Sequence, residues 1–235
     1  GTSSPRGLLE IGNAAGTTDV DQKLFITGDQ VNASGNFATL VLSNSNRSGS
    51  SSSQIAAGRD VDNIGTNLQF FTHPQSGSET EHFRISSDGS LSTPTAGTSN
   101  VRFGVNAGNS IASGGNFNVV VGDEAGTTIN TGDENVLMGY KAGQALSSGT
   151  SNVAIGNEAL HTEDGHGKNV AVGLQSLHTL NAGADGFNTA VGYQSGKLMT
   201  TGTQSTFIGA LAGDAIVAAA DNVAVGYLAL STEVG

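Results

Sequence analysis

A short alternation of apolar and polar residues recurs along the second half of the chain. The phrase "NVAIGNEAL" begins at Asn152, and its close variants "NVAVGLQSL", "NTAVGYQSG" and "NVAVGYLAL" begin at Asn169, Asn188 and Asn222. The apolar residues of each phrase alternate and are mostly the β-branched Val and Ile, which indicates a β-strand. Each phrase therefore predicts one short strand that ends at its glycine.

This glycine sets the register of the repeat. Successive glycines lie 18, 17, 17, 17, 19, 17 and 17 residues apart. We expect a positive φ at this position, where glycine carries no steric cost. A period of 17 residues is too short for repeats of paired helices, which need more than about 30 residues, and it favours a β-solenoid with one coil per repeat. The eight glycines are Gly104, Gly122, Gly139, Gly156, Gly173, Gly192, Gly209 and Gly226.

An asparagine stands four residues before the glycine in seven repeats, and Ser205 takes its place in the eighth. Equivalent residues of neighbouring coils stack about 4.8 Å apart, so their amides can hydrogen-bond to one another. The column predicts a structural Asn ladder. An asparagine merely tolerated at a turn would be interspersed with Asp, Ser and Gly. The seven residues are Asn100, Asn118, Asn135, Asn152, Asn169, Asn188 and Asn222.

The strand's middle residue is often alanine, as at Ala154, Ala171, Ala190 and Ala224. We expect the larger Val and Ile to fill the coil interior, so this alanine would lie on the opposite face. A small apolar residue there indicates a second packed surface. One coil buries too few apolar side chains to offset the entropy of ordering it. Trimerisation about the rod axis would supply the additional burial.

These phrases resemble the repeats of known fibre proteins. The pattern "NxAVGxxA" resembles the heads of trimeric autotransporter adhesins, which form a parallel β-roll in a homotrimer, although their repeats are usually shorter. It is closer to the "NTAVGYQAL"-type repeats of phage tail fibres and related bacterial fibre adhesins. "NTAVGYQSG" (Asn188–Gly196) matches these at nearly every position. The resemblance implies a homotrimeric fibre, often followed by an intramolecular chaperone of the endosialidase type.

The first hundred residues also resemble such fibres. "GTSSPRGLLEIGN" from Gly1 is similar to junctions between fibre modules, and "HFRISSDGSLST" (His82–Thr93) is similar to the segment that closes a module. Between them, "LFITGD", "FATLVLSN" and "NLQFFTH" alternate like strands, separated by polar linkers such as "SNRSGSSSS". We therefore predict an all-β chain, with a compact β module over residues 1–96 and a parallel β-roll or β-solenoid of about eight coils over residues 97–235.

The composition agrees with this architecture and limits the kinds of partner that the chain is expected to bind. Glycine contributes 35 residues and proline 3, while charged residues make up only 12% of the chain, a profile typical of turn-dense β proteins. The formal net charge is −11 without any basic run, so nucleic acid is not an expected partner. No apolar run approaches the roughly 20 residues that span a bilayer, so we expect no membrane insertion. The chain has no cysteine, which excludes a disulfide framework and suits an extracellular fibre.

Carboxylates are the first candidates for catalysis. Glu124 and Glu158 share a repeat column, but two coils separate them and Lys141 lies between, which predicts a neutralised surface ladder. Adjacent acids on a strand point to opposite faces and rarely cooperate. The segment "HTEDGHG" (His161–Gly167) contains metal-ligating residue types, but we interpret it as a solvated loop between coils. We expect no catalytic residue, no cofactor and no metal.

Aromatic side chains at turns are the candidates for ligand binding. Three tyrosines immediately follow the repeat glycine and could stack on sugar rings, although a ring there could also simply shield the strand end. Another pair flanks the insertion in the 19-residue repeat, where solenoids place loops. A third group lies on a predicted loop edge of the first module. The candidates are Tyr140, Tyr193, Tyr227, His178, Phe187, Phe70, Phe71 and His73.

Together these observations predict a non-enzymatic, homotrimeric fibre adhesin segment. It would be extracellular, on a cell-surface fibre or a virion tail, and would attach to a target cell through a glycan or glycoconjugate. One alternative is a passive spacer whose binding tip lies elsewhere in the fibre. Another is a tailspike that depolymerises glycans. An ice-binding solenoid would need a regular Thr ladder, which these repeats lack.

Overall fold

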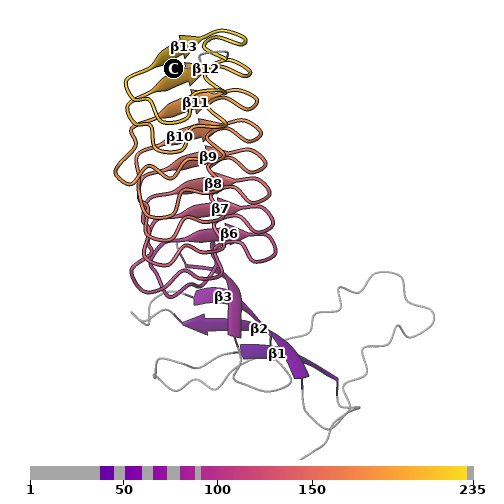
Figure 1. The fold of residues 1–235 in the computed structure, drawn as a ribbon. Coiled ribbons are helices and arrows are strands. Elements are labelled where there is room, and N and C mark those ends of the chain that lie inside the picture. Colours follow the sequence, from indigo (N-terminus) through magenta and orange to yellow (C-terminus); the bar gives the residue numbers. More distant parts are fainter. Residues whose placement is uncertain (1–37, 45–50, 60–65, 73–79, 88–90, 232–235) are drawn as a thin grey trace, which may run out of the picture.

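The computed structural model describes residues 38–44, 51–59, 66–72, 80–87 and 91–231 (Figure 1). The described residues form strands, turns and bends without a helix, which confirms the all-β class. Among them there is accordingly no helix long and apolar enough to cross a membrane. The predicted strand "LFITGD" and the junction at Gly1 lie outside the described residues.

The first sheet is an antiparallel meander of five strands in the order β1-β2-β3-β4-β5. The predicted strands in "FATLVLSN" and "NLQFFTH" correspond to β1 and β3. The linker "SNRSGSSSS" is shorter than predicted, because its last three serines already pair with β1 as the start of β2. The strands are β1 (Ala38–Asn44), β2 (Ser51–Arg59), β3 (Thr66–Thr72), β4 (Thr80–Ile85) and β5 (Leu91–Ser92).

The second sheet is parallel and contains eight strands in sequence order, one from each coil. Paired residues in neighbouring strands are 17 to 19 positions apart, so the chain winds into a β-solenoid of about seven turns. Figure 1 shows β6 nearest the first sheet and β13 at the far end. The strands are β6 (Val101–Phe103), β7 (Val119–Val121), β8 (Val136–Met138), β9 (Val153–Ile155), β10 (Val170–Val172), β11 (Thr189–Val191), β12 (Thr206–Ile208) and β13 (Val223–Val225).

Residues 93–100, between the two sheets, hydrogen-bond to the first strand of the solenoid and to one another. The predicted boundary near residue 96 falls here, between the end of β5 and the start of β6. The Thr93 hydroxyl accepts a hydrogen bond from Arg102 N at 3.0 Å, and the Thr95 hydroxyl accepts one from Asn100 Nδ2 at 2.9 Å. Arg102 occupies the strand position that is apolar in later coils. Its Nε donates to Ala107 O at 2.7 Å, and burial lowers its pKa.

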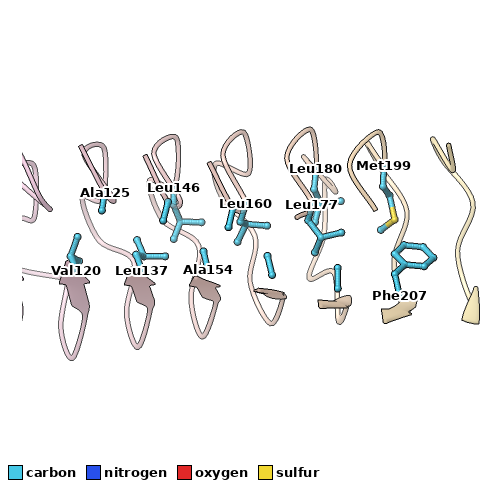
Figure 2. Close-up of a cluster of buried hydrophobic side chains, with 14 of the residues drawn as sticks. Val120, Ala125, Leu137, Leu146, Ala154, Leu160, Leu177, Leu180, Met199 and Phe207 are labelled. Atoms are coloured by element: carbon cyan, nitrogen blue, oxygen red, sulfur yellow. The ribbon is translucent and has the colours of Figure 1, made fainter. Parts of the chain in front are cut away.

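The strands face the opposite way from our prediction. The middle residue of each strand points into the coil, and Leu137, Ala154 and Phe207 are all 0% exposed (Figure 2). The flanking residues point outward, so Ile155 remains 36% exposed and Val191 37% exposed. The expectation that Val and Ile fill the core was therefore wrong. A three-residue strand has room for only one inward side chain, and the opposite wall of the coil supplies the others.

That opposite wall comes from the residue seven positions after the repeat glycine. These side chains are buried and meet the strand residues across a narrow interior (Figure 2). The apolar members of this column are Ile111, Ile129, Leu146, Leu180, Met199 and Ile216.

A bulky strand residue is accompanied by glycine four residues after the repeat glycine, in its own coil and in the preceding one. Where the strand supplies Phe207, the turn has Gly213, and a Cβ there would lie 2.5 Å from Phe207 Cδ1. Gly196 of the preceding coil also makes room for Phe207, since a Cβ there would lie 2.8 Å from Phe207 Cδ2. Where the strand supplies only Ala154, the turn has Leu160, which is fully buried. The two positions thus share one volume, as expected in a close-packed core.

The asparagine column forms the predicted ladder inside the coils. Asn135 Nδ2 donates to Asn118 Oδ1 at 3.0 Å and to Gly149 O at 2.9 Å, and Asn135 N donates to the same Asn118 oxygen at 3.0 Å. Both side chains are 0% exposed. The Asn135 amide therefore donates to a backbone carbonyl, and the Asn118 amide oxygen accepts from a backbone N–H of the next coil. In this way the buried amides of the ladder are all hydrogen-bonded, as buried polar groups usually are.

The repeat glycine is required for two reasons. Gly156 has a φ of 136°, and a Cβ on it would lie 2.5 Å from Gly173 O of the next coil. The predicted positive φ is confirmed at all eight glycines. The close approach between coils is a further constraint that the sequence pattern did not reveal.

The shared space between strand and turn can be tested by moving the large side chain from the turn residue to the strand residue of the same coil. We expect Leu160→Gly to lower the free energy of unfolding by about 2–5 kcal/mol, because it leaves a cavity. The effect should be nearer the lower value, since Leu160 has a positive φ that glycine tolerates better. Adding Ala154→Leu should restore at least half of the loss. Urea denaturation measures both variants, with the exposed Leu198→Ala as the control. A double variant no more stable than Leu160→Gly would contradict the shared volume.

The interrupted ladder provides a second test. Ser205 N donates to Asn188 Oδ1 at 3.0 Å, and Ser205 Oγ accepts a hydrogen bond from Asn222 N at 3.2 Å. Serine has no side-chain amide that could also donate to the carbonyl of Ala219 in the next coil. Ser205→Asn should therefore raise the free energy of unfolding by about 0.5–1.5 kcal/mol, the net value of one hydrogen bond. Thermal denaturation beside the exposed Thr201→Asn variant checks it. A fall in stability would show that the site cannot accept the larger side chain.

Candidate functional site

The outward side of the parallel sheet is a regular surface to which all eight repeats contribute. Two columns of side chains flank the buried middle residues; we call them the sheet face. Neither column contains a charged residue, and Met138 and Ile208 are 41% and 43% exposed. The columns are Val101, Val119, Val136, Val153, Val170, Thr189, Thr206 and Val223, beside Phe103, Val121, Met138, Ile155, Val172, Val191, Ile208 and Val225. Seven intervals of about 4.8 Å give a stripe about 34 Å long, and contiguous apolar patches of this kind mark interaction sites.

The three candidate tyrosines border this sheet face. Tyr140, Tyr193 and Tyr227 are 42%, 50% and 72% exposed, each one residue beyond the glycine that ends a strand. They are three coils and then two coils apart, so about 14 Å and 10 Å separate them along the rod. The Lys141 ammonium lies 5.1 Å from the Tyr140 ring centroid. The column therefore presents isolated rings rather than one aromatic groove.

The candidates of the first module lie in a strand. Phe70 and Phe71 belong to β3, which pairs with β2 and β4, so their assignment to a loop edge was wrong. Phe70 packs against Phe83 with ring centroids 5.7 Å apart, and both rings are half-buried. The stretch reads as a loop from its flanking polar residues, but the backbone pairing extends to Thr72. His73 lies outside the described residues.

His178 and Phe187 occupy regular column positions on either side of the longer repeat's loop. His178 stacks on His161 of the preceding coil, with ring centroids 5.0 Å apart and planes 6° from parallel. Phe187 is 55% exposed at a φ of 51°, and the Lys168 ammonium lies 5.0 Å from its ring centroid. The two additional residues of the 19-residue repeat lie between them, after Leu180. The structure thus separates these two candidates instead of joining them at one site.

The segment "HTEDGHG" is not the solvated loop that we predicted. Glu163 is 0% exposed and stands seven residues after Gly156, in the column that is otherwise apolar. Its carboxylate accepts hydrogen bonds from His166 N at 3.1 Å, from His166 Nδ1 at 3.2 Å and from Ala182 N at 3.1 Å. Counting from the repeat glycine would have revealed this core position, but the polar composition of the segment concealed it.

This acidic cluster has the residue types of a metal site. Glu163, Asp164 and His166 each place one ligating atom within 4.8 Å of the others. Three donors already use the Glu163 oxygens, so the carboxylate joins its own coil to the loop of the next one. The cluster therefore has a complete structural explanation.

The carboxylates on the rod surface are paired with amides and lysine. Lys141 Nζ lies 3.5 Å from Glu124 Oε2, and Gln144 Nε2 donates to the same oxygen at 2.9 Å. Gln175 Nε2 donates to Glu158 Oε2 at 2.8 Å, and this bond lowers the pKa of Glu158. The predicted neutralising contact between Lys141 and Glu124 is confirmed. Glu158, in contrast, is held mainly by an amide of the next coil.

Comparison with protein family models, with curated proteins and with solved structures returned no match.

From the stacked histidines we expect the stability of the solenoid to decrease in acid. Burial lowers the pKa of His178 below its ordinary value of 6.5, and the neighbouring His161 and Lys197 lower it further, while Glu158 opposes them. The folded state therefore binds a proton less readily than the unfolded chain. The contribution of His178 to stability is therefore present above about pH 6.5 and is lost as the pH drops through the lowered pKa of the folded state.

His178→Gln removes this titration, so its melting temperature should fall less than that of the wild type between about pH 7 and pH 5. Thermal denaturation across this range measures the difference. The control is His82→Gln, on an exposed residue of the first sheet, which should retain the wild-type slope. Equal slopes for all three proteins would show that the stacked pair does not sense acid.

Proposed function

We propose that this chain is a non-enzymatic segment of a homotrimeric extracellular fibre that attaches to a target cell surface through glycans. The observation that carries the proposal is the sheet face, an uncharged and partly exposed apolar stripe along the whole solenoid. Soluble proteins rarely leave such a surface uncovered. The repeats' resemblance to phage tail fibres and bacterial fibre adhesins supports the same assembly.

Three copies of the chain are a natural cover for this face. The stripe repeats at the strand spacing along the rod, so copies related by rotation about an axis parallel to the rod remain in register over all coils. Closed rotational symmetry buries the same patch on every copy without leaving an open end. Since the face contains no charged side chain, its burial carries no cost of removing ions from water.

The attachment role is supported by the remaining surface. The net charge of −11 and the acidic side chains on the turns oppose binding to nucleic acid and to anionic surfaces. Exposed rings such as Tyr193 and Phe187 lie outside the core, where they are free to contact a partner. A passive spacer is the second candidate, favoured by the observation that the glycine and asparagine columns serve coil stacking alone.

The sheet face can be tested through the mass of the assembly. The chain has a mass of 23.5 kDa, so three copies give about 70 kDa by light scattering or native mass spectrometry. Val191→Lys places a charge within the face, on the sixth of its eight strands, and should yield a folded monomer with an unchanged β-type circular dichroism spectrum. Thr201→Lys makes the same change of charge on the opposite side of the same coil and should remain trimeric. A monomeric wild type, or a trimeric Val191→Lys, would refute this interface.

A further inference from the structure

A polar cleft of about 280 Å³ lies where the first sheet meets the first coil of the solenoid. Glu81 and Arg84 of β4, Ser92 of β5 and the residues Ser99 and Asn100 before β6 line it. Its volume is close to the lower end of the roughly 300–1,000 Å³ typical of small-molecule sites. It therefore suits one small ring rather than a long segment of a polymer.

A β-bulge arranges the charged pair in this cleft. In a regular strand, Glu81 and Arg84 would point to opposite faces, because they are three residues apart. The β3–β4 pairing shifts register at Phe70 and Phe71, so Phe70 opposes Phe83 and Phe71 opposes Glu81, leaving His82 as the extra residue. This brings Glu81 and Arg84 together on one face. Bulges often serve to re-aim a side chain at a functional site.

The pair is rigid before any ligand arrives. Arg84 Nε and Nη2 donate to the two oxygens of Glu81 at 2.7 Å each, and Gln69 Nε2 donates to Glu81 Oε2 at 3.0 Å. The Glu81 side chain is only 15% exposed. A fixed carboxylate of this kind binds a hydroxyl without first losing its own freedom of movement.

Hydrogen-bonding capacity remains around the pair. Glu81 Oε1 accepts one hydrogen bond from Arg84 Nε and has a lone pair available, because a carboxylate oxygen can accept two. The hydroxyls of Ser92 and Ser99 make no hydrogen bond to the part of the chain that the structure describes. The site thus offers several acceptors and donors to a polyhydroxyl compound.

Charge decides which compounds fit. The guanidinium of Arg84 is neutralised by Glu81, so the cleft has no net positive charge with which to hold an acid. The chain as a whole carries −11, which disfavours sialylated, sulfated or uronic-acid sugars further. We propose that this cleft binds one neutral sugar ring of a cell-surface glycan, with Glu81 accepting a ring hydroxyl. The inference rests on the proposed attachment function and names its site.

No aromatic ring lines this cleft, so binding to one copy is weak. A dissociation constant on the order of 1 mM is expected for a single site. Three copies on one fibre, and many fibres on one particle, convert such weak contacts into stable attachment.

The experiment uses the full chain and two sets of probes. Neutral hexoses and N-acetylhexosamines are titrated by saturation-transfer NMR and calorimetry, beside sialic acid and glucuronic acid. At least one neutral sugar should bind, and neither acid should. Ser92→Phe fills the cleft and should weaken that binding at least tenfold, whereas Thr201→Phe, far along the rod, should not change it. Circular dichroism confirms that each variant is folded.

Glu81→Gln gives an independent readout. It removes the neutralising carboxylate and leaves the Arg84 charge, so neutral sugars should bind less tightly and the acidic sugars should begin to bind. Binding of neutral sugars that neither Ser92→Phe nor Glu81→Gln alters would place the sugar elsewhere, which overturns this site but leaves the attachment function intact. No sugar binding at all, together with a blank glycan array, would overturn both and leave the passive spacer.

Discussion

The coils of the solenoid stack so closely that glycine must follow each strand that has another coil above it. Gly173 N donates to Ile155 O of the preceding coil at 2.7 Å, and a Cβ on Gly173 would lie 2.2 Å from Gly192 O of the following one. Backbone hydrogen bonds between coils therefore hold the rod together and exclude any side chain at this point. These hydrogen bonds fix the register between neighbouring coils, and this register aligns the asparagines and the core residues of successive coils into columns.

Several properties follow from this stacking. The interior is narrow and is filled by one strand residue, one residue of the opposite wall and small or apolar residues of the turn. A larger strand side chain such as Phe207 therefore requires a glycine in the adjacent turn. Next to the strands, the buried asparagine amides hydrogen-bond to backbone N–H and C=O groups of the neighbouring coil. The side chains that do not fit inside, such as Ile155 and Val191, form an apolar stripe on the surface. The same constraint thus produces both a stable rod and the surface that we propose associates with other copies.

The sequence predicted the columns well but not the direction in which they face. The positive φ at Gly156 and the amide ladder at Asn135 follow from spacing and residue type alone. The outward position of Val and Ile does not, because a strand of three residues alternates equally well in either orientation. Glu163 was misassigned for a related reason, since its composition suggested solvent while its register placed it in the core. The sequence identified each candidate aromatic side chain, but it did not predict that these side chains would lie apart from one another along the rod.

Repetition in the sequence by itself determined the class of fold, the period of the coil and the roles of the glycine and asparagine columns. These depend on backbone geometry that is the same in every repeat. Tertiary structure alone decided which face is buried, how Glu163 is satisfied and where Glu81 meets Arg84. The buried face depends on packing between each strand and the opposite wall of its coil, which the spacing alone does not orient. The other two depend on irregular features, namely the loop that is two residues longer than its neighbours and the bulge in the first sheet.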